Sequence, residues 1–230
     1  MDTATVWMCS LSDCGQESLL DRLPALLDAA SAARGARWSG ALAAVKVAAG
    51  ELGNTTYLRP AFVRAVVDDL RRRGATPVVV ETTTLYPGRR DTAAGYLDVA
   101  ARNGFCAETL GAPLIIADGL RGGWEASFEL GLPEMERVEV AGALATPPGA
   151  TAAFGRHLAV ADIGVLAAVD PVAIDVAARD LVLASAPAGS GGAAGPETTP
   201  WDGELCADHL RRAAELGVGA MMYRLVRLKG

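Results

Sequence analysis

Three continuous apolar runs, separated by segments of helical spacing, constrain the fold of this chain more than any other feature. The runs are "ALAAVKVA" (41–48), "TPVVVET" (76–82) and "APLIIADG" (112–119). Apolar runs without alternation are typical of strands in a parallel sheet that is buried on both faces. The helical segments between them are opened by Pro60 and capped by Asp91. This order predicts an α/β fold: a mostly parallel sheet with helices on both faces.

The pattern changes after the third run. "EASFELG" and "ERVEV" alternate apolar and polar residues, which predicts a few antiparallel edge strands, such as a hairpin. We expect one α/β domain over residues 1–230, with a mobile Gly/Pro-rich loop at 186–203. The other expected elements are strands at 4–10, within 158–170 and at 219–228, and helices at 17–34, 171–185 and 204–216.

Composition excludes two classes of partner. The 230 residues are 51% hydrophobic and carry a net charge of -6, so a nucleic-acid footprint, which would be basic, is not expected. The start "MDTATVWMCSL" lacks the charged n-region of a secretory signal, and no apolar stretch approaches the roughly 20 residues of a membrane span. We therefore expect a cytoplasmic protein that binds no membrane and no nucleic acid, with a homodimer as the default assembly.

Polar residues gather in the three loops that follow the apolar runs. These loops are Gly50–Pro60, Thr82–Arg90 and Asp118–Gly123. In an open parallel sheet, ligands bind beyond the carboxyl ends of the strands, where such loops converge. Their convergence predicts a site for a small-molecule substrate.

The first loop, "GELGNTTYLRP", holds several groups that can act on a substrate. Glu51 is a candidate general base, and Tyr57 can donate a proton or stack. Asn54 and Thr55 offer neutral hydrogen bonds for substrate binding, and Arg59 can hold a carboxylate or phosphate. The structural alternative is a Gly-hinged loop with an Asn in a turn and a surface arginine.

The second and third loops add hydroxyls and cations that suit an acidic small molecule. Their substrate-binding candidates are Thr83, Tyr86, Arg89, Asp118 and Arg121. A Thr-rich strand end is also common because of β-propensity alone. A pair between Asp118 and Arg121 is the structural alternative for those two residues.

His157 in "FGRH" is a further candidate catalytic acid or base, with a structural role as its alternative. The sequence has no phosphate-binding loop, no dinucleotide fingerprint and no C-x-x-C motif. We therefore expect no cofactor and no metal. A metal-dependent enzyme that uses Glu51, Asp118 and His157 stays an alternative.

Several segments, in the same order, resemble a known family. They are "GELGNTTYLRPAFVRAVVDDLRRRG", "TTTLYPGRRDTAAGYL", "NGF", "GAPLIIADGLRG" and "DIGVLAAVDPVAIDVAARDL". The chain resembles the uncharacterised iron–sulfur centre proteins with domain of unknown function 362. The resemblance covers about residues 42–123 and 158–183.

Two departures from the family qualify what the resemblance implies. Members often carry a ferredoxin-like insert with cysteine-rich cluster motifs, and this chain has no such cysteines, so no iron–sulfur cluster is carried over. The family strand usually ends Lys-x-His-Phe before Gly-Glu, whereas here Lys46 and Val47 are followed by Ala48 and Ala49. The resemblance therefore implies a compact, cluster-less member that reuses the family's site.

These observations favour a cofactor-independent enzyme that acts on a small acidic or carbonyl-bearing metabolite by proton transfer. Isomerisation, cyclisation, dehydration and lyase cleavage all fit, and specialised metabolite biosynthesis is the expected setting. The alternative from another class is a non-catalytic binding or accessory protein for a redox or biosynthetic partner.

Overall fold

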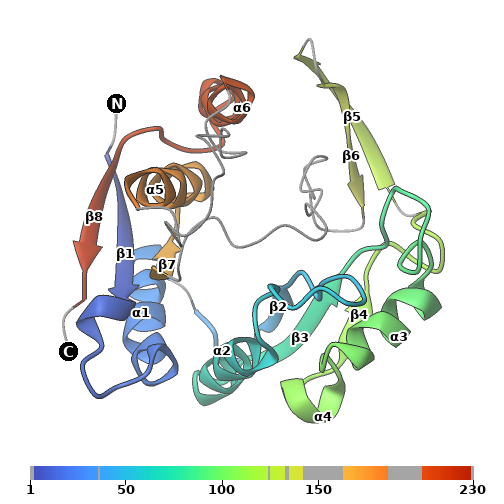
Figure 1. The fold of residues 1–230 in the computed structure, drawn as a ribbon, viewed down its shortest axis with the longest axis horizontal. Helices are drawn as coiled ribbons and strands as arrows, with labels where there is room; N and C mark the ends of the chain where they lie inside the picture. The colour runs from blue at the N-terminus through green and yellow to red at the C-terminus, as the bar shows by residue number, and fades with distance from the viewer. Residues whose placement is uncertain are drawn as a thin grey trace, which may run out of the picture. The chain divides into compact units, whose positions relative to one another are not determined.

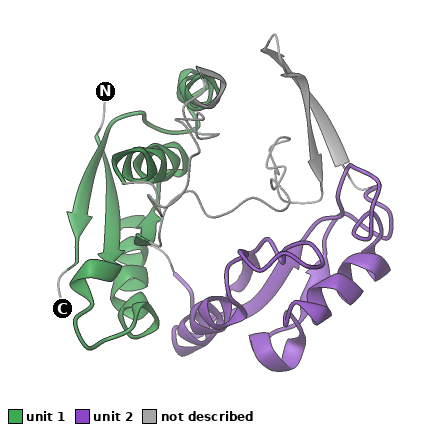
Figure 2. Cartoon of the chain, in the orientation of Figure 1, with its two compact units in different colours: residues 1–36, 157–230 green, residues 37–156 purple. Residues whose placement is uncertain are grey.

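The fold is α/β, as the order of the apolar runs predicts (Figure 1). The computed structural model describes residues 3–35, 37–123, 125–132, 135–141, 163–185 and 204–228. The chain divides into two compact units, residues 1–36 with 157–230 and residues 37–156 (Figure 2). The single domain over residues 1–230 stays a prediction, and the loop at 186–203 lies outside the described residues.

The unit of residues 37–156 is built around a parallel three-stranded sheet in the order β2-β3-β4. In register, Val45 lies opposite Val79, and Val79 lies opposite Leu114. The three strands correspond to the three apolar runs of the sequence. Their bounds are Leu42–Lys46 for β2, Thr76–Glu81 for β3 and Leu114–Ile116 for β4.

Helices cover one face of this sheet. The connections from β2 to β3 and from β3 to β4 proceed in the same direction across the sheet. Since such connections are right-handed, both place their helices on the same face. Val63 and Val67 share one core with Tyr96, Ala100 and the central strand. The helices are α2 (Pro60–Arg72), α3 (Ala93–Arg102) and the short α4 (Ala107–Leu110).

Local rules explain most helix starts, with one correction. Pro60 occupies the first turn of α2, as expected. The cap of α3 is Thr92, whose hydroxyl accepts from the N–H of Gly95, and not Asp91 as predicted. Asp and Thr are both favourable N-cap residues, so the sequence alone does not show which of the neighbours Asp91 and Thr92 caps the helix. The sequence does not predict α4, whose four residues are too few for a periodic pattern.

The alternating segments form an antiparallel hairpin, as predicted. Strand β5 (Glu125–Leu132) pairs with β6 (Met135–Ala141) in a two-stranded sheet of their own. The ladder is irregular between Glu129 and Leu132.

The other unit, residues 1–36 and 157–230, contains a mixed sheet in the order β7-β1-β8. Strand β1 lies in the middle, antiparallel to β7 and parallel to β8. Val6 of β1 packs with Ala173 and Ala177 of α5 on one face. Cys9, whose side chain points to the opposite face, contacts the Arg22 carbonyl of α1. Helices therefore cover both faces of this sheet. The elements are β1 (Ala4–Ser10), the 3₁₀ turn η1 (Leu11–Asp13), α1 (Leu19–Arg34), β7 (Gly164–Ala168), α5 (Pro171–Ala184), α6 (Glu204–Glu215) and β8 (Tyr223–Arg227).

Capping side chains fix two of these helices. Ser18 and Asp21 form a capping box at the start of α1. Asp170 caps α5 by accepting from the N–H of Ala173, and its other oxygen accepts from the N–H of Ala220. Within the described ranges, no helix has the length and apolar character to cross a membrane.

Candidate functional site

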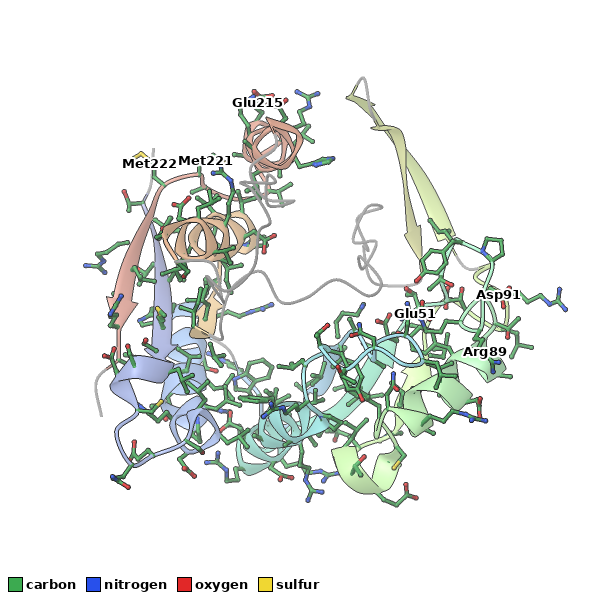
Figure 3. All side chains as sticks on the ribbon, in the orientation of Figure 1. Glu51, Arg89, Asp91, Glu215, Met221 and Met222 are labelled. Carbon is green, nitrogen blue, oxygen red and sulfur yellow. The ribbon has the colours of Figure 1, made fainter. Side chains whose placement is uncertain are left out.

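The candidate site lies at the carboxyl edge of the β2-β3-β4 sheet. Glu51 lies on the loop that follows β2, and Arg89 lies on the loop that precedes α3 (Figure 3). Strands β2 and β3 end side by side, since Lys46 lies opposite Val80 in register. The side chains at this edge come from one unit, residues 37–156.

Glu51, Tyr86 and Arg90 form a hydrogen-bonded cluster. The Tyr86 hydroxyl donates to Glu51 Oε1 at 2.6 Å, and Arg90 Nη2 donates to the Tyr86 hydroxyl at 2.6 Å and also to Glu51 Oε1. Both contacts to the carboxylate converge on Oε1, and among the described residues none is made to Oε2. The Glu51 side chain is 12% exposed. The cluster therefore holds a carboxylate in place by one oxygen and leaves the other uncommitted.

Arg90 is the buried cation of this cluster. Its side chain is 10% exposed, its Nη1 donates to the Tyr96 hydroxyl at 3.3 Å, and its guanidinium lies 5.2 Å from the Tyr96 ring centroid. Burial is the largest single effect and disfavours the charged form. The hydrogen bond to Glu51 and the electrostatic interactions with Tyr96, Glu51 and Tyr86 together outweigh it, so the pKa of Arg90 is raised. Arg90 Nε is buried without a hydrogen-bond partner. This guanidinium therefore stays charged and compensates Glu51.

A second ion pair continues the network. Lys46 Nζ lies 2.9 Å from Glu81 Oε1, and Glu81 Oε2 accepts from the Thr82 N–H at 2.6 Å. Burial, followed by the negative charge of Glu81 and a hydrogen bond to it, raises the pKa of Tyr96. Tyr96 thus links the pair to Arg90, and the network balances two cations against two carboxylates.

Tyr86 lies at the exposed end of the network, with 37% of its surface accessible. Partial burial and the hydrogen bond to Glu51 raise the pKa of Tyr86 above its ordinary value. Its hydroxyl therefore keeps its proton at neutral pH while remaining within reach of solvent.

Asn103 and Tyr57 hold the loop that carries Glu51. Asn103 Nδ2 donates to the carbonyls of Ala49 at 2.9 Å and Glu51 at 3.3 Å, and the Tyr57 hydroxyl donates to the Asn103 carbonyl at 3.2 Å. The Tyr57 ring packs edge-on against Phe105. No hydrogen bond in the described part of the chain joins Tyr57 to Glu51, so its contacts are those of a positioning residue.

Gly50 is the backbone pivot of this loop. Its φ is +76°, and a Cβ there would lie 2.4 Å from Tyr57 Cδ1. Gly50→Ala is expected to lower the free energy of unfolding by about 2–4 kcal/mol, because strain and overpacking add. The control is Gly53→Ala, where φ is +87° and nothing lies within 4 Å of the added Cβ, so only about 1–2 kcal/mol is lost. Equal losses in urea denaturation would contradict the clash with Tyr57.

Asp118 and Thr83 tie the second loop to the third. Asp118, 1% exposed, accepts from the Thr83 N–H at 2.9 Å and from the Thr83 hydroxyl at 2.6 Å. Gly122 lies close to both, since a Cβ there would come within 2.6 Å of Thr83 Oγ1. Asp118 therefore pairs with Thr83 and not with Arg121, which was the structural alternative in the sequence.

The structure brings together only some of the predicted site residues. Glu51 with Tyr86, and Thr83 with Asp118, are joined directly. Asn54 closes a turn, accepting from the N–H and hydroxyl of Thr56, each at 2.8 Å. The exposed candidates, for which the described residues show no side-chain partner, are Thr55, Arg59, Arg89 and Arg121. His157 lies outside the described residues.

Sequence reasoning missed four members of the network as site residues. Arg90 directly follows the candidate Arg89, and Tyr96 lies within the helix predicted after Asp91. Lys46 and Glu81 end two adjacent predicted strands, and opposite charges at such a pair of ends are a signal of contact. Within the described ranges, no group of three or more His, Cys, Asp or Glu residues could hold a metal ion.

Comparison with known proteins places this site in a family. No curated protein and no solved structure matches the chain. A family model, Domain of unknown function (DUF362), matches residues 43–146, which run from the second residue of β2 past the end of β6 and contain all the network residues. The match supports the resemblance over residues 42–123, whereas residues 158–183 lie outside it. Residues 43–146 of the chain, which carry the whole network, match the DUF362 family.

Proposed function

We propose that this protein is an enzyme that moves a proton on a small acidic or carbonyl-bearing metabolite. One observation carries the proposal: Glu51 Oε1 is fixed by Tyr86 and Arg90, while Oε2 accepts no hydrogen bond from a described residue. A carboxylate held in one orientation, with a free oxygen, is suited to accept a substrate proton. The site lies where open parallel sheets bind ligands.

Glu51 and Tyr86 would play complementary roles. Glu51 Oε2 takes a proton from substrate carbon, and the Tyr86 hydroxyl, whose single hydrogen is donated to Glu51 Oε1, holds the carboxylate in that orientation. The raised pKa of Tyr86 favours the protonated donor at neutral pH. Arg90 touches both groups and keeps their geometry. Isomerisation, cyclisation, dehydration and lyase cleavage all begin with such a transfer, and no added cofactor is needed for it.

Exposed arginines favour an acidic substrate. Arg59 follows β2, Arg89 follows β3 and Arg121 follows β4, so each loop at this edge contributes one cation without a described partner. Cations around a site concentrate anions and bind carboxylates bidentately. We propose that these residues attract and hold the acidic group of the metabolite.

Solvent deuterium exchange tests the proposal without knowledge of the substrate. The purified protein is incubated in D₂O with a panel of 2-oxo acids, hydroxy acids and aldehydes, and loss of carbon-bound protons is followed by ¹H NMR. We expect catalysed exchange for at least one acid, and we expect it to persist in EDTA. No exchange with any compound would count against an enzyme, and loss of exchange in EDTA would favour the metal-dependent alternative.

A further inference from the structure

Lys46 is an unusual cation in this chain. It is one of two lysines, with Lys229, and the remaining 19 of the 21 basic residues are arginines. In every other ion pair between described residues the cation is an arginine. An ammonium is a compact point charge with three rotatable donors, whereas guanidinium is a rigid planar fork. A lysine therefore suits a position that must serve acceptors in three directions.

The contacts of Lys46 leave one donor unused. Its Nζ lies 2.9 Å from Glu81 Oε1 and donates to the Val47 carbonyl at 2.8 Å. An ammonium has three N–H donors, so the third has no partner among the described residues. The side chain is 32% exposed, so this donor is open to a solute.

Glu81 fixes the position of the ammonium. Its side chain is 7% exposed, and its second oxygen is held by the Thr82 N–H at 2.6 Å. Tyr96 connects Glu81 to Arg90, and Arg90 binds Glu51. Lys46 and Glu51 therefore belong to one network at the same sheet edge, in which Tyr96 lies under the influence of both ion pairs.

We propose that Lys46 is a further substrate-contacting residue of this site, and that the substrate is a 2-oxo acid or a similar carbonyl acid. This inference rests on the proposed function. When the carbon-bound proton passes to Glu51 Oε2, the electron pair of the C–H bond forms the C=C bond of the enolate, and the π electron pair of the carbonyl moves onto its oxygen. The free N–H of Lys46 binds that oxygen and stabilises the enolate, because a fixed charge aimed at developing charge lowers the barrier. The ammonium keeps its proton, and no bond to lysine forms.

Binding of oxalate, a planar mimic of a 2-oxo acid enolate, tests this assignment by calorimetry. We expect Lys46→Met to weaken oxalate binding by about 10- to 100-fold, the range for one charged hydrogen bond. The matched control is Arg64→Met, which removes an exposed ion-paired cation on α2 and should leave binding within about twofold. Unchanged oxalate binding in Lys46→Met would overturn the inference.

A second variant separates binding from stability. Lys46→Met leaves the buried Glu81 unpaired and risks unfolding, so Lys46→Met with Glu81→Gln removes both charges. This double variant should fold and still bind oxalate at least about 10-fold more weakly than wild type. Wild-type affinity in the folded double variant would refute the role of Lys46.

Amine labelling gives a readout on the unaltered protein. A small acylating reagent labels the chain at Lys46, Lys229 and the terminal amine, and mass spectrometry resolves the sites. Oxalate should protect Lys46 and leave labelling of Lys229 unchanged, and equal labelling at Lys46 with and without oxalate would contradict contact. Both readouts need no turnover. If the protein catalyses deuterium exchange but binds oxalate independently of Lys46, only the role of Lys46 is refuted. If oxalate binding depends on Lys46 but no exchange is observed, only the proposed proton transfer is refuted.

Discussion

The Glu51→Gln variant is expected to lower the rate of solvent deuterium exchange by at least about 100-fold. Glutamine keeps the size of the side chain, and its carbonyl oxygen can still accept from Tyr86 and Arg90. What it lacks is an anionic oxygen that can take a proton. The change therefore removes the chemistry while keeping the hydrogen-bond geometry.

Exchange measured by ¹H NMR, with oxalate affinity measured in parallel, checks this prediction. The matched control is Asp98→Asn, the same loss of charge in an exposed ion pair with Arg102 on α3, and it should keep wild-type exchange. Exchange in Glu51→Gln within a few-fold of wild type would show that another group accepts the proton. Tyr86→Phe serves as a companion variant, because it removes the hydroxyl that donates to Glu51 Oε1 and leaves the ring in place.

The fold could be predicted to a large extent, because its signals are local. The apolar runs became β2, β3 and β4, and Pro60 and Asp170 mark the starts of α2 and α5 as their chemistry requires. What could not be predicted is how strands group into sheets. β1, β7 and β8 are far apart in sequence, and no residue pattern states which strands will pair across such distances.

The site could be predicted at the level of loops and only partly at the level of residues. The convergence of three loops was inferred from sheet topology, and it brought Glu51 together with Tyr86 as a hydrogen-bonded pair. The sequence does not distinguish the roles of Arg89 and Arg90, because neighbours of the same type differ only in the direction of the side chain. Arg90 is buried and Arg89 is exposed, which depends on the path of the loop before α3.

The residues that were missed share a physical property. Arg90, Tyr96 and Glu81 are buried, and each interacts with another member of the network. Buried charges are retained only with partners, so none of them can be assigned until the others are placed. The network therefore acts as one unit, and the loss of Arg90, its central cation, should affect the surroundings of both Glu51 and Glu81.

Arg90→Met is expected to lower the free energy of unfolding by about 3–5 kcal/mol, the range for breaking a buried ion pair by removing one partner. Methionine fills part of the volume but leaves the carboxylate of Glu51, in a side chain 12% exposed, without its cation. It also removes the donors to Tyr86 and Tyr96. Urea denaturation followed by circular dichroism measures the loss.

Two further variants decide whether the effect belongs to the ion pair. Arg102→Met breaks an exposed pair with Asp98, 57% and 54% exposed, and should cost less than about 1 kcal/mol. Arg90→Met with Glu51→Gln removes the uncompensated charge and should recover part of the stability, because breaking a buried pair costs more than replacing it. If Arg90→Met costs no more than Arg102→Met, or if Glu51→Gln recovers nothing, then burial of this pair does not stabilise the edge on which the site is built.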